Sequence, residues 1–281
     1  MRRALPCAHP AEKWGGIYMK GVCFMQYRKG IDVSKWQGGI DWEKVKGSGI
    51  EFAMLRAGYG RGNIDAQFER NAAECERLGI PYGAYWFSYA YTPEMAAAEA
   101  ASCLEAVKGR KLSYPVAYDF EGDSVEFAEK SGAAVTRELA SAMARAFCGA
   151  VRAGGRYPMI YTNPSFLQRY FDAQLPREYD IWLAQWPAKP DPAAPPALAT
   201  GMWQYSSSGS VDGIEGRVDL DAAYKDYPAL TGGGSATADT TEAERARDWV
   251  MKKGISDGTS PDAPATRQQV WVMLYRMNGG K

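Results

Sequence analysis

The sequence predicts an irregular (β/α) barrel, a TIM-like α/β fold, followed by a small helical module. Three observations lead to this fold class. Short apolar strands alternate with helical patterns from Gly30 to about Tyr227, the strand candidates number eight, and the last connections are too short or too rich in proline for full helices. An open doubly wound sheet is the alternative, but no glycine-rich phosphate loop follows the first strand.

The strand candidates are short apolar runs of the kind that parallel sheets bury on both faces. In chain order they are residues 30–35, 52–57, 82–87, 115–120, 157–162, 180–184, 201–205 and 217–220. Their number and their alternation with helices favour the closed barrel over the open sheet.

The helices between these strands have start and stop signals. Asp65 is expected to cap a helix that ends at Gly79, and Thr92-Pro93 supplies an N-cap followed by proline at the first helical position. A long helix is predicted near 132–153. Its apolar stripe consists of Leu139, Met143, Phe147 and Val151.

Three segments flank the barrel, which we place at residues 29–227. Residues 1–28 are an extension of unassigned role that lacks the apolar centre of a signal peptide. Residues 228–243 are rich in Gly, Ser and Thr, which predicts a flexible linker. Residues 244–281 are expected to form a small helical module, with a capping-box pattern at Thr266. No apolar run reaches the length of a membrane span, so none is expected.

Composition excludes several classes of function. The 281-residue chain has a formal net charge of zero, so no electrostatic binding of nucleic acid or of an anionic membrane is expected. Its one histidine, His9, lies in the N-terminal extension, so the imidazole of a Ser-His-Asp or Cys-His enzyme is missing. The five cysteines form no C-x-x-C pair, and their odd number favours a reducing compartment. We expect no metal and no cofactor, and carboxyl groups as the acid and the base.

The C-terminal ends of the predicted strands carry polar or aromatic residues. In a parallel barrel these ends surround the mouth at which the chemistry takes place. Core packing alone does not account for such a pattern. The residues at these ends are Asp32, Arg56, Tyr85-Trp86, Asp119 and Glu121, Tyr161, Gln185-Trp186, Trp203-Gln204 and Asp219.

The tripeptide Asp119-Phe120-Glu121 ends the fourth predicted strand with two acids. Residues two apart project from the same face of a strand, so both carboxyl groups are expected in the barrel mouth, with α-carbons about 6–7 Å apart. Two carboxyl groups this close push their pKa values apart, which gives the acid and the anion that glycosidic cleavage requires. The tripeptide alone leaves a solvated pair of loop acids or a metal site open.

Asp32 and Asp219 end the first and last predicted strands. These strands are neighbours in a closed barrel, so the two acids are expected to converge. Asp221 is placed in the turn that follows, with a structural role.

Seven segments, in a fixed order over about residues 29–224, carry a resemblance to a known family. They are GIDVSKWQG, FAMLRAGYG, GIPYGAYWFSYA, YPVAYDFEG, YPMIYTNPSF, IWLAQW and MWQYSSSGSVDGIEGRVDLD. Together they resemble glycoside hydrolase family 25, the Chalaropsis-type lysozymes of fungi, bacteria and phages. The resemblance implies an irregular (β/α) barrel that cleaves the β-1,4 bond between N-acetylmuramic acid and N-acetylglucosamine in peptidoglycan. After the second strand the chain has Arg56-Ala-Gly-Tyr-Gly60 instead of one form of the family signature, which affects subsite details.

The resemblance also implies roles for individual residues. By position, Glu121 matches the general acid, and Asp119, Asp32 and Asp219 match the other acids of the cleft. The nucleophile is expected to be the 2-acetamido group of the substrate, with net retention and with an aspartate that orients it; Asp119 is favoured and Asp219 comes next. The residues expected to bind sugar are Tyr85, Tyr161, Trp203, Gln204, Gln185 and Trp36.

Residues 249–276 resemble part of one surface-layer homology repeat, a module that anchors proteins to cell-wall polymers. The resemblance implies a secondary cell-wall polymer as a partner of this module; a degenerate tail or a dimerising helical pair is the alternative. Because no signal peptide is recognised, we expect synthesis in the cytoplasm and release by lysis or a holin-type partner, as for a phage endolysin. We expect a monomer that acts on bacterial peptidoglycan.

Two other functions stay open on the sequence alone. The first is a catalytically inactive protein that binds cell-wall carbohydrate, against which the intact acids Asp119, Glu121, Asp32 and Asp219 count. The second is a chitinase-like barrel glycosidase, which is disfavoured because the chain has no acidic D-x-x-D-x-D-x-E strand.

Overall fold

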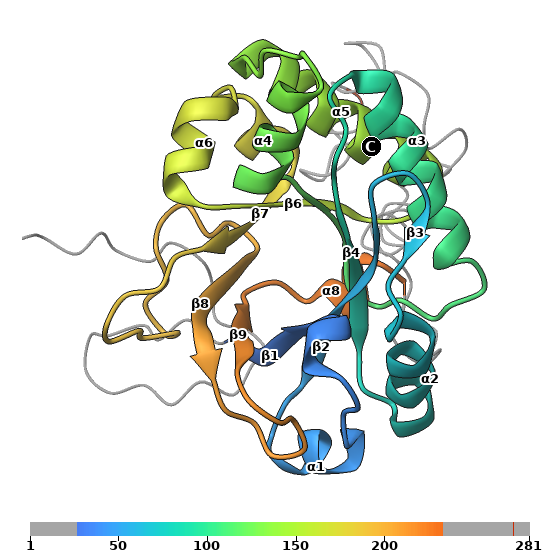
Figure 1. The fold of residues 1–281 in the computed structure, drawn as a ribbon. Coiled ribbons are helices and arrows are strands. Elements are labelled where there is room, and N and C mark those ends of the chain that lie inside the picture. Colours follow the sequence, from blue (N-terminus) through green and yellow to red (C-terminus); the bar gives the residue numbers. More distant parts are fainter. Residues whose placement is uncertain (1–26, 233–271, 273–281) are drawn as a thin grey trace, which may run out of the picture. The chain divides into compact units, whose positions relative to one another are not determined.

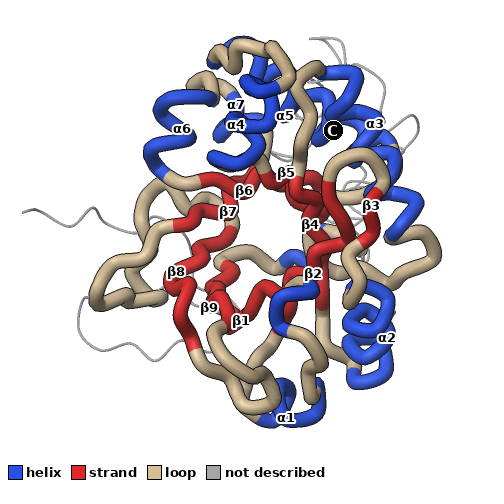
Figure 2. The backbone as a smooth tube through the Cα atoms, in the orientation of Figure 1, coloured by secondary structure: helices blue, strands red, loops and turns tan. Residues whose placement is uncertain are grey.

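Eight strands close into a barrel in the computed structural model, which describes residues 27–232 and Val272. The barrel strands are β1 (Arg28–Val33), β2 (Phe52–Tyr59), β4 (Tyr82–Phe87), β5 (Val116–Asp119), β6 (Pro158–Thr162), β7 (Asp180–Ala184), β8 (Met202–Gly209) and β9 (Val218–Ala223). Strand β1 pairs with both β2 and β9, which closes the ring seen in Figure 2. The short strand β3 (Asn63–Ile64) pairs with β2 alone. The predicted irregular barrel is confirmed.

Strand β9 runs antiparallel to both of its neighbours, whereas the other barrel strands pair in parallel. Only residues 210–217 connect β8 to β9, which is too short for the crossover that a parallel partner needs. As a result, the beginning of β9 lies beside the C-terminal end of β1. Asp219 is the second residue of β9 and pairs with Asp32 in the register.

Helices cover the outside of the barrel (Figure 1). They are α1 (Trp42–Gly47), α2 (Phe68–Leu78), α3 (Pro93–Ala106), α4 (Gly122–Lys130), α5 (Arg137–Ala153), α6 (Pro164–Tyr170), α7 (Leu175–Glu178) and α8 (Tyr227–Leu230), with a 3-10 turn at Lys35–Gln37. Thr92 caps α3 as predicted, accepting a hydrogen bond from the Met95 backbone N–H. No helix connects β7 to β8, which also agrees with the sequence.

Two details of the helices differ from the prediction. The helix expected near 132–153 begins later, at Arg137, because Thr136 caps it through the backbone N–H of Leu139. Asp65 does not cap the helix that ends at Gly79, since the N-cap position is Gln67. The Asp65 carboxylate instead accepts hydrogen bonds from Arg56 Nε and from the Lys35 backbone N–H.

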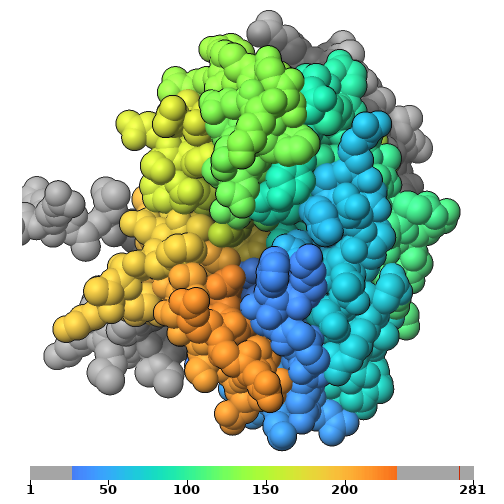
Figure 3. Space-filling model, viewed as in Figure 1, coloured from blue at the N-terminus to red at the C-terminus, as the bar shows by residue number. Residues whose placement is uncertain are grey.

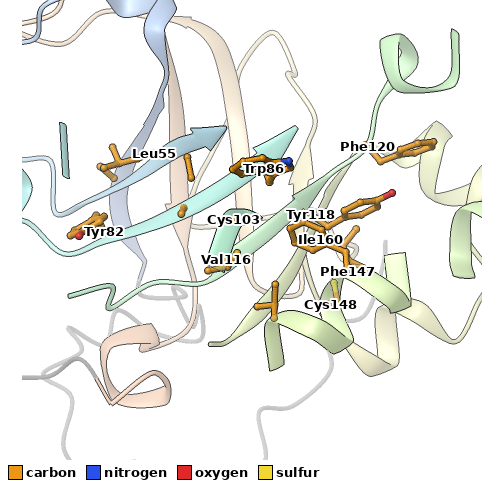
Figure 4. Packing of buried hydrophobic residues seen from close by; sticks show 14 of the residues in the cluster. Leu55, Tyr82, Trp86, Cys103, Val116, Tyr118, Phe120, Phe147, Cys148 and Ile160 are labelled. Carbon is orange, nitrogen blue, oxygen red and sulfur yellow. The ribbon is translucent and has the colours of Figure 1, made fainter. Parts of the chain in front are cut away.

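The apolar side chains form two cores, one on each side of the strands. The outer core lies between strands and helices and includes Trp86, Tyr118, Phe147 and the buried cysteine Cys148 (Figure 4). The inner core fills the barrel and contains Phe52, Met54, Tyr114, Met159, Trp182, Met202 and Tyr227, among others. The ring that looks open in the backbone trace is therefore packed with side chains (Figure 3). The mouth above this packing is where a site can form.

Most residues of the three predicted flanking segments lie outside the described part of the chain. This applies to the extension 1–28 except its last two residues, to most of the linker 228–243, and to the module 244–281 with its surface-layer homology resemblance. At the barrel boundary, α8 continues the fold to Leu230, past the predicted end at 227, because Asp226 caps it through the backbone N–H of Ala229. Within residues 27–232, no helix has the length and apolar character needed to cross a membrane.

Candidate active site

A cavity of about 190 Å³ lies at the mouth of the barrel, at the C-terminal ends of the parallel strands. Strands from opposite sides of the ring supply its walls, so residues far apart in the sequence meet there. The lining residues are Asp32, Ser34, Trp36, Gln37, Arg56, Tyr85, Phe87, Asp119, Glu121, Tyr161, Trp182, Gln204 and Asp219. Four of them are acids, which is a large number for so small a volume.

The adjacent acids Asp119 and Glu121 form one wall of the cavity. Asp119 ends β5 and is 4% exposed, whereas Glu121 precedes α4 and is half-buried, with its backbone N–H donating to Ser124 Oγ at 3.1 Å. Burial raises the pKa of Asp119 well above its usual value, and the Glu121 carboxyl group raises it further. Burial also raises the pKa of Glu121. Because neither group ionises easily beside the other, the pair retains a proton to higher pH than an ordinary carboxyl group.

Arg56 places a positive charge beside this pair. Its guanidinium lowers the pKa of Asp119, but burial and the Glu121 carboxyl group have larger effects in the other direction, so the pKa of Asp119 stays raised. The Nη2 atom of Arg56 and the Oδ1 atom of Asp119 are both buried without a hydrogen-bond partner among the described residues. Buried polar atoms of this kind are usually satisfied, so these two are available to a ligand.

Asp65 holds Arg56 in place. Its Oδ2 accepts a hydrogen bond from Arg56 Nε at 2.7 Å and another from the Lys35 backbone N–H at 3.1 Å, while Oδ1 accepts from the Gln67 backbone N–H at 2.9 Å. Asp65 is 2% exposed, so the ion pair is shielded from solvent. This buried carboxylate therefore fixes both the cavity arginine and the loop after β1, which explains why it is not a helix cap.

Asp32 and Asp219 line the opposite wall, where β1 pairs with β9, and Asp221 lies near them without lining the cavity. Asp32 and Asp219 are register partners, and Asp221, which we expected in a turn, lies within β9 and is fully buried. Burial raises the pKa of Asp219 to about 6 and that of Asp221 to about 8. Burial, followed by the charges of Asp221 and Asp219, raises the pKa of Asp32. The strand pairing thus puts a second group of proton-holding acids across the cavity from Glu121.

Gln204 links this acid group to the aromatic wall. Its Nε2 donates to Asp32 Oδ2 at 2.7 Å, and its Oε1 accepts from Tyr161 Oη at 3.0 Å and from Trp186 Nε1 at 3.1 Å. The side chain is 2% exposed, and both ends of the amide are occupied. Gln204 therefore fixes the orientation of Asp32 and of Tyr161 together.

Trp182 forms the floor of the cavity. Its Nε1 donates to Asp221 Oδ1 at 2.7 Å, and its ring packs edge-on against Tyr85 at 5.9 Å and Tyr161 at 4.8 Å between centroids. At the rim, Trp36 is 76% exposed and lies under the Lys35 ammonium at 4.8 Å. An exposed aromatic face beside a polar cavity suits stacking on a sugar ring.

The structure brings most of the predicted site residues together. Asp32, Asp119, Glu121, Asp219, Tyr85, Tyr161, Gln204 and Trp36 all line the cavity. Trp203 does not line it: its ring belongs to the outer core, and its Nε1 donates to the Gln185 carbonyl at 2.7 Å. The Gln185 side chain is exposed and also lies outside the lining. Both residues support β8 and the loop after β7, and their side chains do not face the cavity.

The predicted site residues did not include Trp182, Asp221 or Arg56. Arg56 was recognised as the end of a predicted strand, but the sequence does not show that it lies beside the buried Asp119. Trp182 lies inside a fully buried strand, where the apolar pattern does not tell which face points inward. Asp221 was placed in a turn because the predicted last strand ended at residue 220, whereas β9 continues to Ala223.

We expect Asp221→Asn to change how stability depends on pH. An unfolded aspartate titrates near pH 3.9, and the folded pKa is about 8. The stability that this acid contributes is therefore complete below about pH 4 and is lost as pH rises towards 8. The amide cannot ionise, so the variant does not lose this stability. Its unfolding free energy relative to that of wild type should rise by roughly 2–5 kcal/mol between pH 4 and pH 9. Denaturant unfolding across this range measures the difference. Equal pH dependence in Asp221→Asn and in the exposed control Asp212→Asn would contradict the assignment.

The cavity chemistry is that of carboxyl groups. In the described part of the chain, no cluster of three or more His, Cys, Asp or Glu side chains has an arrangement that could hold a metal ion. What the arrangement offers is a shielded pair of acids that retains a proton, an arginine beside this pair, and aromatic surfaces. These parts suit acid-assisted cleavage of a sugar polymer.

Comparison with known proteins agrees with this chemistry. The family model described as Glycosyl hydrolases family 25 matches residues 31–214. YegX of Escherichia coli O157:H7 is 30% identical over 203 residues, which is 68% of each chain. Lysozyme M1 of Streptomyces globisporus is 29% identical over 206 residues, or 68% of this chain and 66% of the lysozyme.

The comparison extends to solved structures. The modular autolysin LytC of Streptococcus pneumoniae, solved in complex with a synthetic peptidoglycan ligand, superposes with a TM-score of 0.63 at 29% identity. The superposition covers 72% of this chain and 48% of LytC. This chain therefore corresponds to about half of that autolysin.

Proposed function

Since the chain belongs to glycosyl hydrolases family 25 and is a lysozyme-type glycoside hydrolase, we propose that it is an N-acetylmuramidase. Its substrate would be the β-1,4 bond between N-acetylmuramic acid and N-acetylglucosamine in bacterial peptidoglycan. The observation that carries the proposal is the pair of Asp119 and Glu121 in the shielded cavity, with Arg56 on the Asp119 side. The peptidoglycan ligand of LytC and the lysozyme name of the Streptomyces relative point to the same polymer.

Glu121 is the proton donor in this proposal. It is half-buried at the cavity mouth, so a glycosidic oxygen can reach it, and its raised pKa keeps the acid form available to higher pH than in an ordinary glutamate. Asp119 lies deeper, where burial raises its pKa, and the charge of the neighbouring Arg56 acts in the opposite direction. In the proposed complex the proton is on Glu121, where the glycosidic oxygen reaches it, and Asp119 is ionised beside Arg56 and the acetamido N–H of the substrate.

The proposed reaction has two steps with net retention. In the first, the acetamido oxygen of the muramic acid unit bonds to C1 while Glu121 gives its proton to the leaving oxygen, and the Asp119 carboxylate accepts the hydrogen bond of the acetamido N–H. In the second, Glu121 takes a proton from water as the water oxygen bonds to C1 and the acetamido oxygen leaves. This follows the substrate-assisted variant of glycoside hydrolysis, in which the enzyme supplies no covalent nucleophile.

The other cavity residues would hold the glycan in this proposal. Trp36 and Tyr85 offer aromatic faces, and Gln204 keeps Asp32 and Tyr161 in one hydrogen-bonded set. A catalytically inactive wall-binding protein is the second candidate, but the buried acid pair is costly to keep in a protein that only binds.

Analysis of reducing ends tests the bond that is cleaved. Purified peptidoglycan is digested with the full chain, the new ends are reduced with borohydride, and the labelled sugar is identified by mass spectrometry. We expect muramitol, because cleavage after N-acetylmuramic acid exposes its C1. Glucosaminitol as the labelled sugar, or binding without release of soluble fragments, would exclude the proposal.

A further inference from the structure

A second cavity, of about 570 Å³, lies at the opposite end of the barrel from the acids. Pro158 and Asp180 begin β6 and β7 and line this cavity, whereas Tyr161, near the end of β6, lines the catalytic one. Its remaining walls come from the end of α5, from α7 and from the segment around α8. They are Arg152, Gly155, Arg156, Tyr157, Pro176, Arg177, Glu178, Tyr179, Thr200, Lys225, Leu230 and Thr231.

The acid at the base of this cavity already accepts three hydrogen bonds from its neighbours. Asp180 Oδ1 accepts from Lys225 Nζ at 2.5 Å, and Oδ2 accepts from Tyr157 Oη at 2.9 Å and from Tyr227 Oη at 3.0 Å. The ion pair with Lys225 also neutralises its charge. Asp180 is therefore a structural anchor that holds the walls together.

The cavity keeps several unused donors. The second acid, Glu178, forms an ion pair with Arg145, which does not line the cavity. Arg152, Arg156 and Arg177 form no ion pair with the described residues, so their charges are not neutralised there. The Nη2 of Arg152 donates to one backbone carbonyl, and the Nη2 of Arg156 donates to two. The other guanidinium N–H groups of the three arginines donate to no described residue. The result is a donor-rich, positively charged cavity.

The Arg152 side chain is already oriented. Its guanidinium lies 4.9 Å from the centre of the Tyr179 ring, and its Nη2 donates to the Glu178 carbonyl at 3.2 Å. A guanidinium held in this way loses less freedom when it binds a ligand. A planar guanidinium group can donate two parallel hydrogen bonds to two oxygens of one phosphate group. Several guanidinium groups around one cavity therefore favour an anion with many acceptor oxygens.

We propose that this cavity is a binding site for a phosphate group, held by Arg152, Arg156 and Arg177 at the N-terminal end of the barrel. The site lies away from the catalytic cavity, so both can be occupied at once. If the chain acts on cell walls as proposed above, a phosphodiester-linked wall polymer and a free phosphate ester are two sources of the same group. The binding itself does not depend on the catalytic proposal.

Calorimetry on the full chain tests the site with two probes, sn-glycerol 3-phosphate and poly(glycerol phosphate). The variant is Arg152→Gln/Arg177→Gln, which removes two of the three charges. We expect it to bind about tenfold or more weakly than wild type, since each lost contact is a charge-assisted hydrogen bond. Binding of the short ester indicates a small-molecule site, and binding of the polymer alone indicates the wall polymer as the source.

Arg137→Gln is the matched control. Arg137 is also exposed and donates to one backbone carbonyl, that of Gln168, but it does not line the cavity. The control should bind both probes like wild type, and the double variant should still release soluble fragments from peptidoglycan that lacks phosphate. The proposal is overturned if neither probe binds to wild type, or if Arg137→Gln weakens binding as much as the double variant does.

Discussion

Glu121→Gln is expected to lower turnover of peptidoglycan by about 10³-fold while the fold stays intact. Glutamine has the size and hydrogen-bonding shape of the acid but carries no transferable proton, so the leaving oxygen would depart as an unprotonated alkoxide. The backbone of Glu121 is fixed by its own N–H donating to Ser124 Oγ, which the substitution leaves in place. Release of soluble fragments from purified peptidoglycan measures the loss, and thermal unfolding checks the fold.

Glu129→Gln is the control, because Glu129 is an exposed acid of α4, the helix that follows Glu121, and does not line the cavity. It should keep wild-type turnover. The pH profile adds a second readout: since burial raises the pKa of Glu121, the wild-type rate should fall as pH rises through that raised pKa, when the proton is lost. The residual rate of Glu121→Gln should lack this decline. Turnover near the wild-type level in Glu121→Gln would remove this residue from the acid role.

The positions of the strands could be predicted, and the direction of the last one could not. All eight strand candidates overlap a barrel strand, because buried strands are short apolar runs between turn residues. Apolar content does not report direction, so β9 was treated like the others. The length of its connection was the available signal: residues 210–217 cannot hold a crossover helix, which requires an antiparallel partner.

The site could be predicted where it depends on strand ends and not where it depends on which face points inward. Asp119 and Glu121 share a face by simple alternation, and closure of the barrel brings Asp32 to Asp219. Trp203 and Trp182 are both buried, yet only Trp182 lines the cavity. A strand that is buried on both faces has no polar face, so its sequence does not indicate which residues point into the barrel. Only the structure therefore distinguishes the two tryptophans.

Asp119→Asn is expected to lower turnover by about 10²–10³-fold, for a different reason from Glu121→Gln. The carboxylate is proposed to orient the acetamido group and to stabilise the positive charge that develops on it. The neutral amide still offers an oxygen to the acetamido N–H but cannot balance that charge. Asn also leaves Arg56 without the neighbouring anion, so thermal unfolding should accompany the rate measurement.

A double-change cycle, which combines the Asp119→Asn variant with a modified substrate, distinguishes orientation of the acetamido group from covalent attack by Asp119. Wild type and Asp119→Asn are each assayed on peptidoglycan with intact and with removed N-acetyl groups. If Asp119 acts through the acetamido group, removing that group already costs wild type most of the rate, and the mutation then adds little, because the two losses share one interaction. If the losses multiply, or if a glycosyl group is trapped on Asp119, the carboxylate itself attacks C1. Glu121 would remain the acid in that case, and only the first bond formed at C1 would differ.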